Sequence, residues 1–164
     1  MALLTYTTYD EIRAALGVSD TELPDTVLAL PMYNVFAANV LEDVHVNLAD
    51  DFAAMSALPS PTAAQSRFID LVKLYVLFGI AKQLTTSLPL FSVSQLSDGR
   101  AGFSRYDEAY KDLIGGIEQN LLSIRYRLYA SYTSLFPGTA ITAPSTTFSL
   151  VKATGLAVSP VTNA

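Results

Sequence analysis

The sequence predicts an all-α fold, a helical bundle of about four helices in which two long antiparallel helices form the core and an extended C-terminal arm follows. Apolar residues recur at steps of three and four along most of residues 9–136, which is the spacing of amphipathic helices. Capping residues, glycines and prolines divide this stretch into segments of helical length. From residue 137 onward the chain is rich in Thr, Ser, Ala, Val and Pro and shows no helical period. We therefore predict a helical domain at 1–136 and an extended arm at 137–164.

The first expected helix has both a start signal and a stop signal. Thr8 and Glu11 have the spacing of a capping box, in which each side chain accepts a hydrogen bond from the backbone N–H of the other residue. A short helix over residues 9–16 would end at Gly17, because glycine adopts the left-handed conformation of a helix end without strain. Pro24 suits the first turn of the helix that follows.

A second helix is expected over about residues 24–52. Pro31 should bend or restart it near its beginning, since proline lacks the backbone N–H that a helix interior needs. Its apolar positions recur at helical spacing and are expected to face the core. These positions are Val35, Phe36, Val40, Val44 and Leu48.

Two longer helices should make most of the core. Residues 62–88 are apolar around most of the helix circumference, which is typical of a central helix. The last helix should begin between positions 98 and 104 and reach Phe136. We expect Leu77 and Leu121 to be buried in the core. The adjacent glycines at 115 and 116 indicate close packing or a bend, because glycine costs a helix about 1 kcal/mol relative to alanine.

Composition limits the classes of function. The chain has 164 residues, 51% of them hydrophobic, and a formal charge of −5. Its mean hydropathy of +0.34 suggests surface that is buried against partners. A protein that coats DNA would normally be basic, so tight binding of phosphates is not expected. The absence of cysteine excludes disulfides, thiolate metal sites and cysteine nucleophiles.

Charge is unevenly distributed along the chain. Residues 1–70 carry a net charge of −8 and residues 71–164 a net charge of +3. Such halves would attract neighbouring copies head to tail, although chance placement on solvated faces is an equally good interpretation. On the first interpretation, acidic residues of one subunit contact basic residues of the next. The residues expected in these inter-subunit charge contacts are Glu42, Asp43, Asp50, Asp51, Arg125 and Arg127.

The sequence contains no evident catalytic constellation, so we expect no enzyme activity, no cofactor and no metal site. The only histidine, His45, is interpreted as a polar residue on a helix surface, since a catalytic triad also needs a positioned nucleophile and an orienting acid. The nearby acidic residues are interpreted as a solvated face rather than metal ligands. The most apolar run, residues 74–80, is too short and too charged at its edges to span a membrane.

A charged turn precedes the last helix. The turn motif consists of Ser97, Asp98, Gly99 and Arg100, followed by Arg105. It looks like the approach to an active site, but it lacks the Lys-Ser/Thr pair and the glycine spacing of a phosphate loop. Asp-Gly is a turn dipeptide, so we interpret the segment as a reversal that leads into the last helix.

Two stretches resemble the head-to-tail adaptor (connector) proteins of tailed bacteriophages. The N-terminal YDEIRAALGVSDTELPDTVL is similar to the opening of that family: a short helix, a polar turn and a Leu-Pro-Asp entry to the next helix. The later SDGRAGFSRYDEAY resembles the family's Ser-Asp-Gly-basic turn, which leads to an Arg-aromatic pair, here Arg105 and Tyr106, at the head of the last long helix. The resemblance covers residues 6 to about 136 and does not reach the arm.

The resemblance implies a structural virion protein without catalytic activity. In this family a small helical subunit forms a dodecameric homo-oligomeric ring below the portal protein, in the neck between capsid and tail. The ring extends the DNA channel, through which genomic DNA passes without specific binding, and tail proteins (nozzle, tube or fibre) dock on it. Such a protein assembles in the host cytoplasm. The alternative is an unrelated helical scaffold or tail-completion protein of lower oligomeric state.

The C-terminal arm is too polar to build a core of its own and too apolar for a simple linker. We expect it to dock onto the portal protein or a neighbouring subunit by adding a strand to its partner. The apolar residues expected to make this contact are Phe148, Leu150, Val151, Leu156 and Val158. The other interpretation is a disordered terminus without a role.

Overall fold

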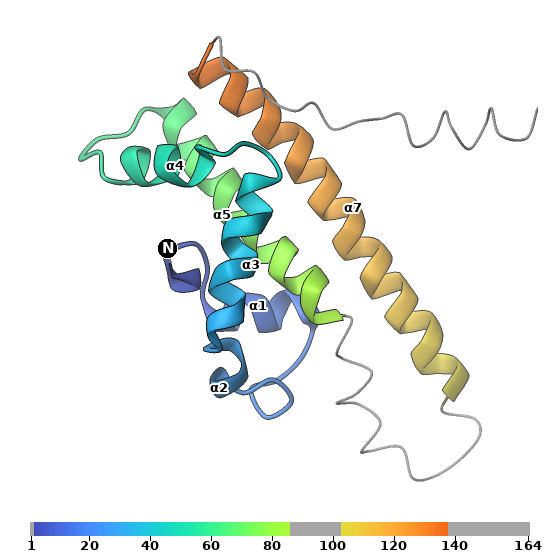
Figure 1. Cartoon of the computed structure of the whole chain (residues 1–164). Coiled ribbons are helices and arrows are strands. Elements are labelled where there is room, and N and C mark those ends of the chain that lie inside the picture. Colours follow the sequence, from blue (N-terminus) through green and yellow to red (C-terminus); the bar gives the residue numbers. More distant parts are fainter. Residues whose placement is uncertain (1, 86–102, 138–164) are drawn as a thin grey trace, which may run out of the picture.

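The computed structural model describes residues 2–85 and 103–137, and it describes side chains from residue 111 onward in the second range. These residues form helices joined by turns, which confirms the predicted all-α class (Figure 1). The elements in chain order are η1 (Leu3–Thr5), α1 (Tyr9–Leu16), α2 (Asp25–Leu28), α3 (Pro31–Glu42), α4 (Leu48–Ser56), α5 (Ala63–Thr85) and α7 (Phe103–Leu135).

Helix α5 is the centre of the fold, and α1, α3, α4 and α7 all pack against it (Figure 1). Its buried positions recur at helical spacing from Phe68 onward, and in its last two turns they cover most of the circumference, with Lys82 and Gln83 exposed. A helix that is buried on nearly every side needs apolar residues on nearly every side. The prediction that this segment is the central helix is therefore confirmed.

The two long helices, α5 and α7, run antiparallel, as predicted. Near one end the ring of Phe68 lies 6.1 Å from that of Tyr132 and 6.2 Å from that of Phe136, measured between centroids. Near the other end Lys82 forms an ion pair with Glu118. Residue numbers therefore rise along α5 as they fall along α7.

Helix α1 has the predicted bounds and the predicted capping box. The Oγ1 atom of Thr8 accepts a hydrogen bond from the backbone N–H of Glu11 at 3.2 Å, and the Glu11 carboxylate accepts one from the backbone N–H of Thr8 at 2.8 Å. The bond from the Thr8 backbone, together with one from the hydroxyl of Thr7, lowers the pKa of Glu11 below its ordinary value. At the other end Gly17 has a φ of 67°, the left-handed conformation expected for a glycine that stops a helix.

The guanidinium of Arg13 ties α1 to the start of α2. Its Nη1 atom donates to the backbone oxygen of Leu23 at 3.1 Å and to the Asp25 carboxylate at 2.6 Å. Its Nη2 atom donates to the Asp10 carboxylate at 2.6 Å. The side chain of Arg13 is only 11% exposed, so these partners offset the cost of removing its charge from water. They also hold the polar turn between α1 and α2 closed.

The single helix expected over residues 24–52 is wrong, because α2, α3 and α4 form there. Pro31 is the first residue of α3, and Leu30 before it is extended, as a residue that precedes proline prefers. After α3 the chain turns through residues 43–47, where the backbone N–H of Val44 bonds a carbonyl three residues back. Proline therefore restarts the helix, and a second, unforeseen turn separates α3 from α4.

The apolar positions expected to face the core from this region divide into two groups. Val44 and Leu48 are buried, and Phe36 and Val40 are half-buried against the core. Val35 is 58% exposed and lies on the opposite side of α3. The buried positions of α3 are Tyr33, Ala37 and Leu41.

The core lies mainly between α5 and α7, and the N-terminal helices complete it. Leu77 and Leu121, which we expected to be buried, are only half-buried at its edge. The helical register of α7 instead turns Leu128 and Tyr132 fully inward. The largest fully buried side chains include Tyr132, Phe52, Phe68, Ile12, Leu23, Leu28, Leu41, Leu48, Ile80 and Leu128.

One glycine brings two helices into close contact. A Cβ atom added at Gly79 of α5 would lie 2.8 Å from Cγ1 of Val40 on α3, closer than real Cβ contacts allow. The Gly115-Gly116 pair of α7 differs, because a Cβ at either position would meet no described atom within 4 Å. The close packing predicted for this pair is therefore not made within the described part of the subunit.

Matched glycine substitutions should test this difference. Gly79→Ala should lower the free energy of unfolding by about 1–3 kcal/mol, the usual cost of overpacking, because its methyl group collides with Val40. Gly116→Ala should raise that free energy by up to about 1 kcal/mol, since it removes a glycine from a helix interior without a new contact. Urea denaturation measures both, and Val40→Ala should recover part of the Gly79→Ala loss. Equal stability of Gly79→Ala and wild type would contradict the close contact.

Candidate functional site

A groove of about 470 Å³ opens between α3, α5 and α7. Its floor is the C-terminal half of α5, from Tyr75 to Gln83. Its walls come from the C-terminal part of α3 and the middle of α7. The residues that line it are Val40, Asp43, Tyr75, Gly79, Lys82, Gln83, Glu118, Leu121, Leu122 and Arg125.

Two charged contacts cross this groove. Lys82 Nζ lies 3.1 Å from Glu118 Oε1, with both side chains about half exposed, and Arg125 Nη2 donates to the backbone oxygen of Asp43 at 3.2 Å. Burial raises the pKa of the Tyr75 hydroxyl above its ordinary value, with the charge of Arg125 opposing the shift and that of Asp43 adding to it. An exposed ion pair of this kind contributes no more than about 1 kcal/mol. The contacts therefore orient the walls of the groove more than they stabilise the fold.

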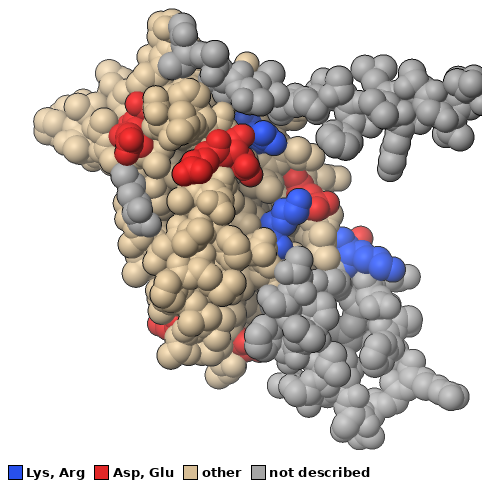
Figure 2. All heavy atoms as spheres, in the orientation of Figure 1, with Lys and Arg blue, Asp and Glu red and all other residues tan. Residues whose placement is uncertain are grey.

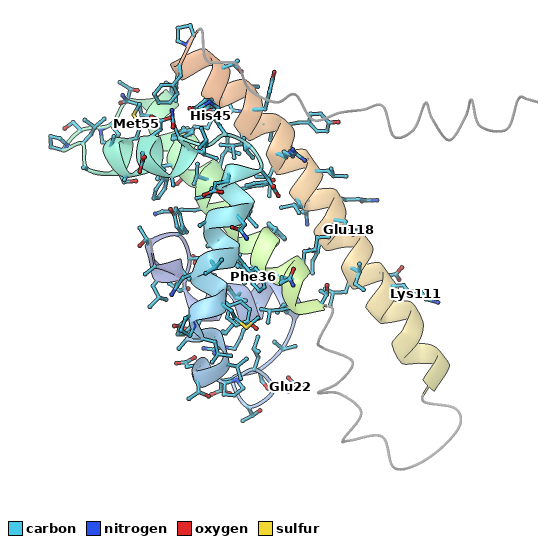
Figure 3. All side chains as sticks on the ribbon, viewed as in Figure 1. Glu22, Phe36, His45, Met55, Lys111 and Glu118 are labelled. Atoms are coloured by element: carbon cyan, nitrogen blue, oxygen red, sulfur yellow. The ribbon has the colours of Figure 1, made fainter. Side chains whose placement is uncertain are left out.

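A second polar cluster joins the first turn of α4 to the last turns of α7. The hydroxyl of Tyr132 donates to the Asp51 carboxylate at 2.6 Å and lies 2.9 Å from Nδ1 of His45. The backbone N–H of Asn47 donates to that same Nδ1 atom at 3.2 Å. His45 belongs to the turn that follows α3 and lies beside the C-terminal part of α7 (Figure 3). The earlier interpretation of His45 as a simple surface histidine is therefore wrong.

The proton of Tyr132 is firmly held in this cluster. Burial, followed by the hydrogen bond to Asp51, raises the pKa of the hydroxyl well above its ordinary value of 10.0. The side chain is fully buried, so no substrate can reach it. Although an acid, a histidine and a hydroxyl lie together, the hydroxyl is neither accessible nor activated as a nucleophile would need to be. The cluster fastens α4 to α7 and has the geometry of a structural network.

The described residues offer neither a metal site nor a membrane-spanning helix. No group of three or more His, Cys, Asp or Glu side chains in residues 2–85 and 111–137 is placed to hold a metal ion. Within the same ranges, none of the helices is long and apolar enough to cross a membrane.

The acidic and basic residues predicted to meet between subunits divide into two groups. Asp43, Asp51 and Arg125 make hydrogen bonds within the subunit, through a backbone oxygen in the case of Asp43. Figure 2 shows acidic side chains gathered where α3 meets α4, with basic side chains of α7 beside them. The remaining members of the predicted set are exposed and make no ion pair with another described residue; they are Glu42, Asp50 and Arg127.

The other predicted site residues lie outside the described part of the chain. The turn motif at 97–100 and the arm residues from Phe148 to Val158 belong to ranges that the structure does not describe. Arg105 lies within α7, but its side chain is not described. The structure therefore brings none of these residues together with the groove or with the charged surface.

Two polar clusters in the structure were missed by the sequence analysis. Arg13 and Asp25 are twelve positions apart, and no motif links them. Tyr132 lies in an apolar stripe of the last helix, a pattern that predicts a core position, and its ring is fully buried. A buried tyrosine hydroxyl needs a hydrogen-bond partner, and this requirement was the only sign in the sequence of the network with Asp51 and His45.

Comparison with other proteins gave no relative for this chain: no family model, no curated protein and no solved structure matches it.

The cluster at Tyr132 should show itself in the pH dependence of stability. Tyr132→Phe should lower the free energy of unfolding at pH 7 by about 1 kcal/mol, through loss of a hydrogen bond to a carboxylate. Because the folded state raises the pKa of Tyr132, the benefit of its hydroxyl is complete below pH 10 and declines as pH rises further. Urea denaturation should therefore show the gap between wild type and variant closing at about pH 11.

Tyr126→Phe is the matched control for this experiment. Its ring is 48% exposed, and the hydroxyl has no hydrogen bond to a described residue, so stability should not change at either pH. A loss of stability in Tyr126→Phe as large as that in Tyr132→Phe would contradict the role given to the buried network.

Proposed function

We propose that the protein is a structural subunit of a phage virion, a head-to-tail adaptor that forms a ring below the portal protein. In this proposal the ring sits in the neck between capsid and tail, extends the DNA channel and gives tail proteins a docking surface. It performs no catalysis and needs no cofactor. The protein assembles in the host cytoplasm and joins the virion as a homo-oligomer.

The observation that carries the proposal is the fold of the N-terminal stretch that resembles the adaptor family. Residues 9–28 form a short capped helix, a closed polar turn and a Leu-Pro-Asp entry to α2, the order that the resemblance implies. Arg13 bonds both the Leu23 carbonyl and the Asp25 carboxylate, so this entry is a built unit rather than a chance run of residues. Helix α7, with 33 residues and a length of about 50 Å, provides the expected last long helix.

The surface of the subunit also supports a protein that works in an assembly. Large apolar side chains are exposed on η1, α3, α5 and α7 and in the segments beside α3 and α4. Apolar surface of this kind is commonly covered by a partner. The exposed residues are Leu4, Leu30, Met32, Val35, Val46, Leu58, Leu74, Leu122 and Tyr126.

The net charge of −5 suits a channel wall through which DNA slides. A basic wall would hold phosphates and release counterions on binding, which would retard the genome. We propose in addition that the arm at 137–164 docks onto the portal protein, with Phe148 and Leu150 among its contacts. An unrelated scaffold or tail-completion protein of lower oligomeric state remains the competing function.

Native mass spectrometry distinguishes the two functions. The full chain should form a discrete ring of many copies, alone or when mixed with purified portal rings from candidate phages. A chain truncated after Phe136 should keep its helical circular dichroism signal and lose attachment to the portal ring. Substitution of Thr146 and Thr147 by Ala in the full chain is the control and should leave attachment unchanged.

Two outcomes would count against the proposal. A full chain that stays monomeric or dimeric with every portal tested would favour the competing function. Equal attachment of the truncated and full chains would show that the arm is not the docking element.

A further inference from the structure

Helix α7 has a second apolar stripe on the side that faces away from the core. Leu122 and Tyr126 are 53% and 48% exposed, and Tyr129 beside them is half-buried. These positions are separated by steps of four and three, and Gly115 and Gln119 continue the same spacing toward the N-terminus. The stripe lies opposite the buried positions of α7, such as Leu128, and we call it the outer face of α7.

Helix α3 has a similar face. Met32 and Val35 are 46% and 58% exposed, and the exposed residues Asn39 and Glu42 continue the stripe at steps of four and three. This outer face of α3 is the side turned away from the buried residue Ala37. Both stripes therefore have the spacing with which two helices pack side by side at a small crossing angle.

The two faces belong to different sides of the subunit. Helices α3 and α7 each pack against α5, and the groove described above separates them (Figure 1). Neither outer face can reach the other within one copy. Contact between them requires two copies.

The exposed charges beside the two faces are opposite. Helix α3 contains no Lys or Arg, and its outer face ends in the exposed carboxylate of Glu42, followed by Asp43. On the C-terminal half of α7, Arg125 bonds Asp43 within the subunit, and Arg127 is exposed on the flank of the outer face, one position after Tyr126. Pairing of like faces would oppose like charges, whereas pairing of α3 with α7 opposes unlike charges. This complementarity argues against a two-fold dimer and for a contact between unlike faces.

We propose that the outer face of α7 in one copy packs against the outer face of α3 in the next copy. With the two helices parallel, Leu122 lies against Met32 and Tyr126 against Val35, and the long side chain of Arg127 extends from the flank of α7 toward Glu42. A contact between unlike faces repeats from copy to copy and gives a closed ring or an open chain. This inference rests on the proposed function, in which the partner is a second copy of this chain, and it names the two surfaces that meet.

The full chain has no cysteine, so single cysteines can map this contact without background. Val35→Cys and Tyr126→Cys are prepared separately, mixed, and treated with a short bis-maleimide. The mixture should give a covalent pair that joins position 35 to position 126, identified by peptide mass spectrometry. Either variant alone should give almost none. Ala14→Cys, at an exposed position of α1 outside both faces, is the control and should not couple to Tyr126→Cys.

The outcomes separate this inference from the proposed function. A ring on native mass spectrometry without a 35–126 product would overturn the contact and leave the adaptor function standing. Coupling of Tyr126→Cys to itself as the main product would also overturn it, because α7 would then face α7. Monomers that give no product would contradict both the contact and the ring.

A charge exchange tests the polar part of the contact. Glu42→Arg and Arg127→Glu should each weaken assembly in low salt, and the double variant should restore it, because the pair is then reversed rather than removed. Both side chains are exposed, so circular dichroism should show normal folding in all three variants. Failure of the double variant to recover assembly would overturn the pairing of Glu42 with Arg127.

Discussion

Burial of α5 is the constraint on which the rest of the structure depends. Every longer helix of the described chain packs against it, and none of those helices could hide its own apolar face without it. At Gly79, α3 packs so closely against α5 that even a methyl group would not fit between them. A domain of this size has one core, and here that core is organised along a single helix axis.

Polar contacts then fix what apolar packing leaves free. The orientation of α1 relative to α2 is fixed by polar contacts. Arg13 of α1 donates hydrogen bonds to the Leu23 carbonyl and the Asp25 carboxylate at the start of α2. The hydroxyl of Tyr132 likewise joins α4 to the C-terminal end of α7 through its contacts with Asp51 and His45. No buried polar side-chain atom among the described residues lacks a partner, which is the condition for a uniquely ordered interior.

The sequence predicted those parts of the fold that depend on local signals. The capping box, the glycine stop at position 17 and the bounds of α7 follow from residues close together in the chain. The break between α3 and α4 could not be foreseen, because Val44 and Leu48 keep helical spacing across a turn that tertiary burial imposes. Leu121 was misplaced for a similar reason, since the rotation of α7 about its own axis is set by its contact with α5.

The candidate site could be predicted only in part. The charged residues expected between subunits were found from the uneven distribution of charge along the chain. Which of them bond within the subunit and which stay exposed depends on how α3 and α7 are arranged in space. Val35 belonged to an apolar pattern that we expected to face the core. Only the packed structure shows that it faces outward and that α7 carries a matching stripe.

Native-state hydrogen exchange tests the central place of α5 most directly. We expect the amides of Val72, Val76 and Ile80 to exchange slowest, and only through global unfolding, whereas those of α1 and α4 should exchange earlier through local fluctuations. Low concentrations of urea should accelerate exchange of the α5 amides most steeply, because global unfolding exposes the most surface, until the amides of α7 and α5 exchange at the same rate. Amides of α5 that exchange as fast as those of α1 or α4 would contradict the claim that the fold is built around this helix.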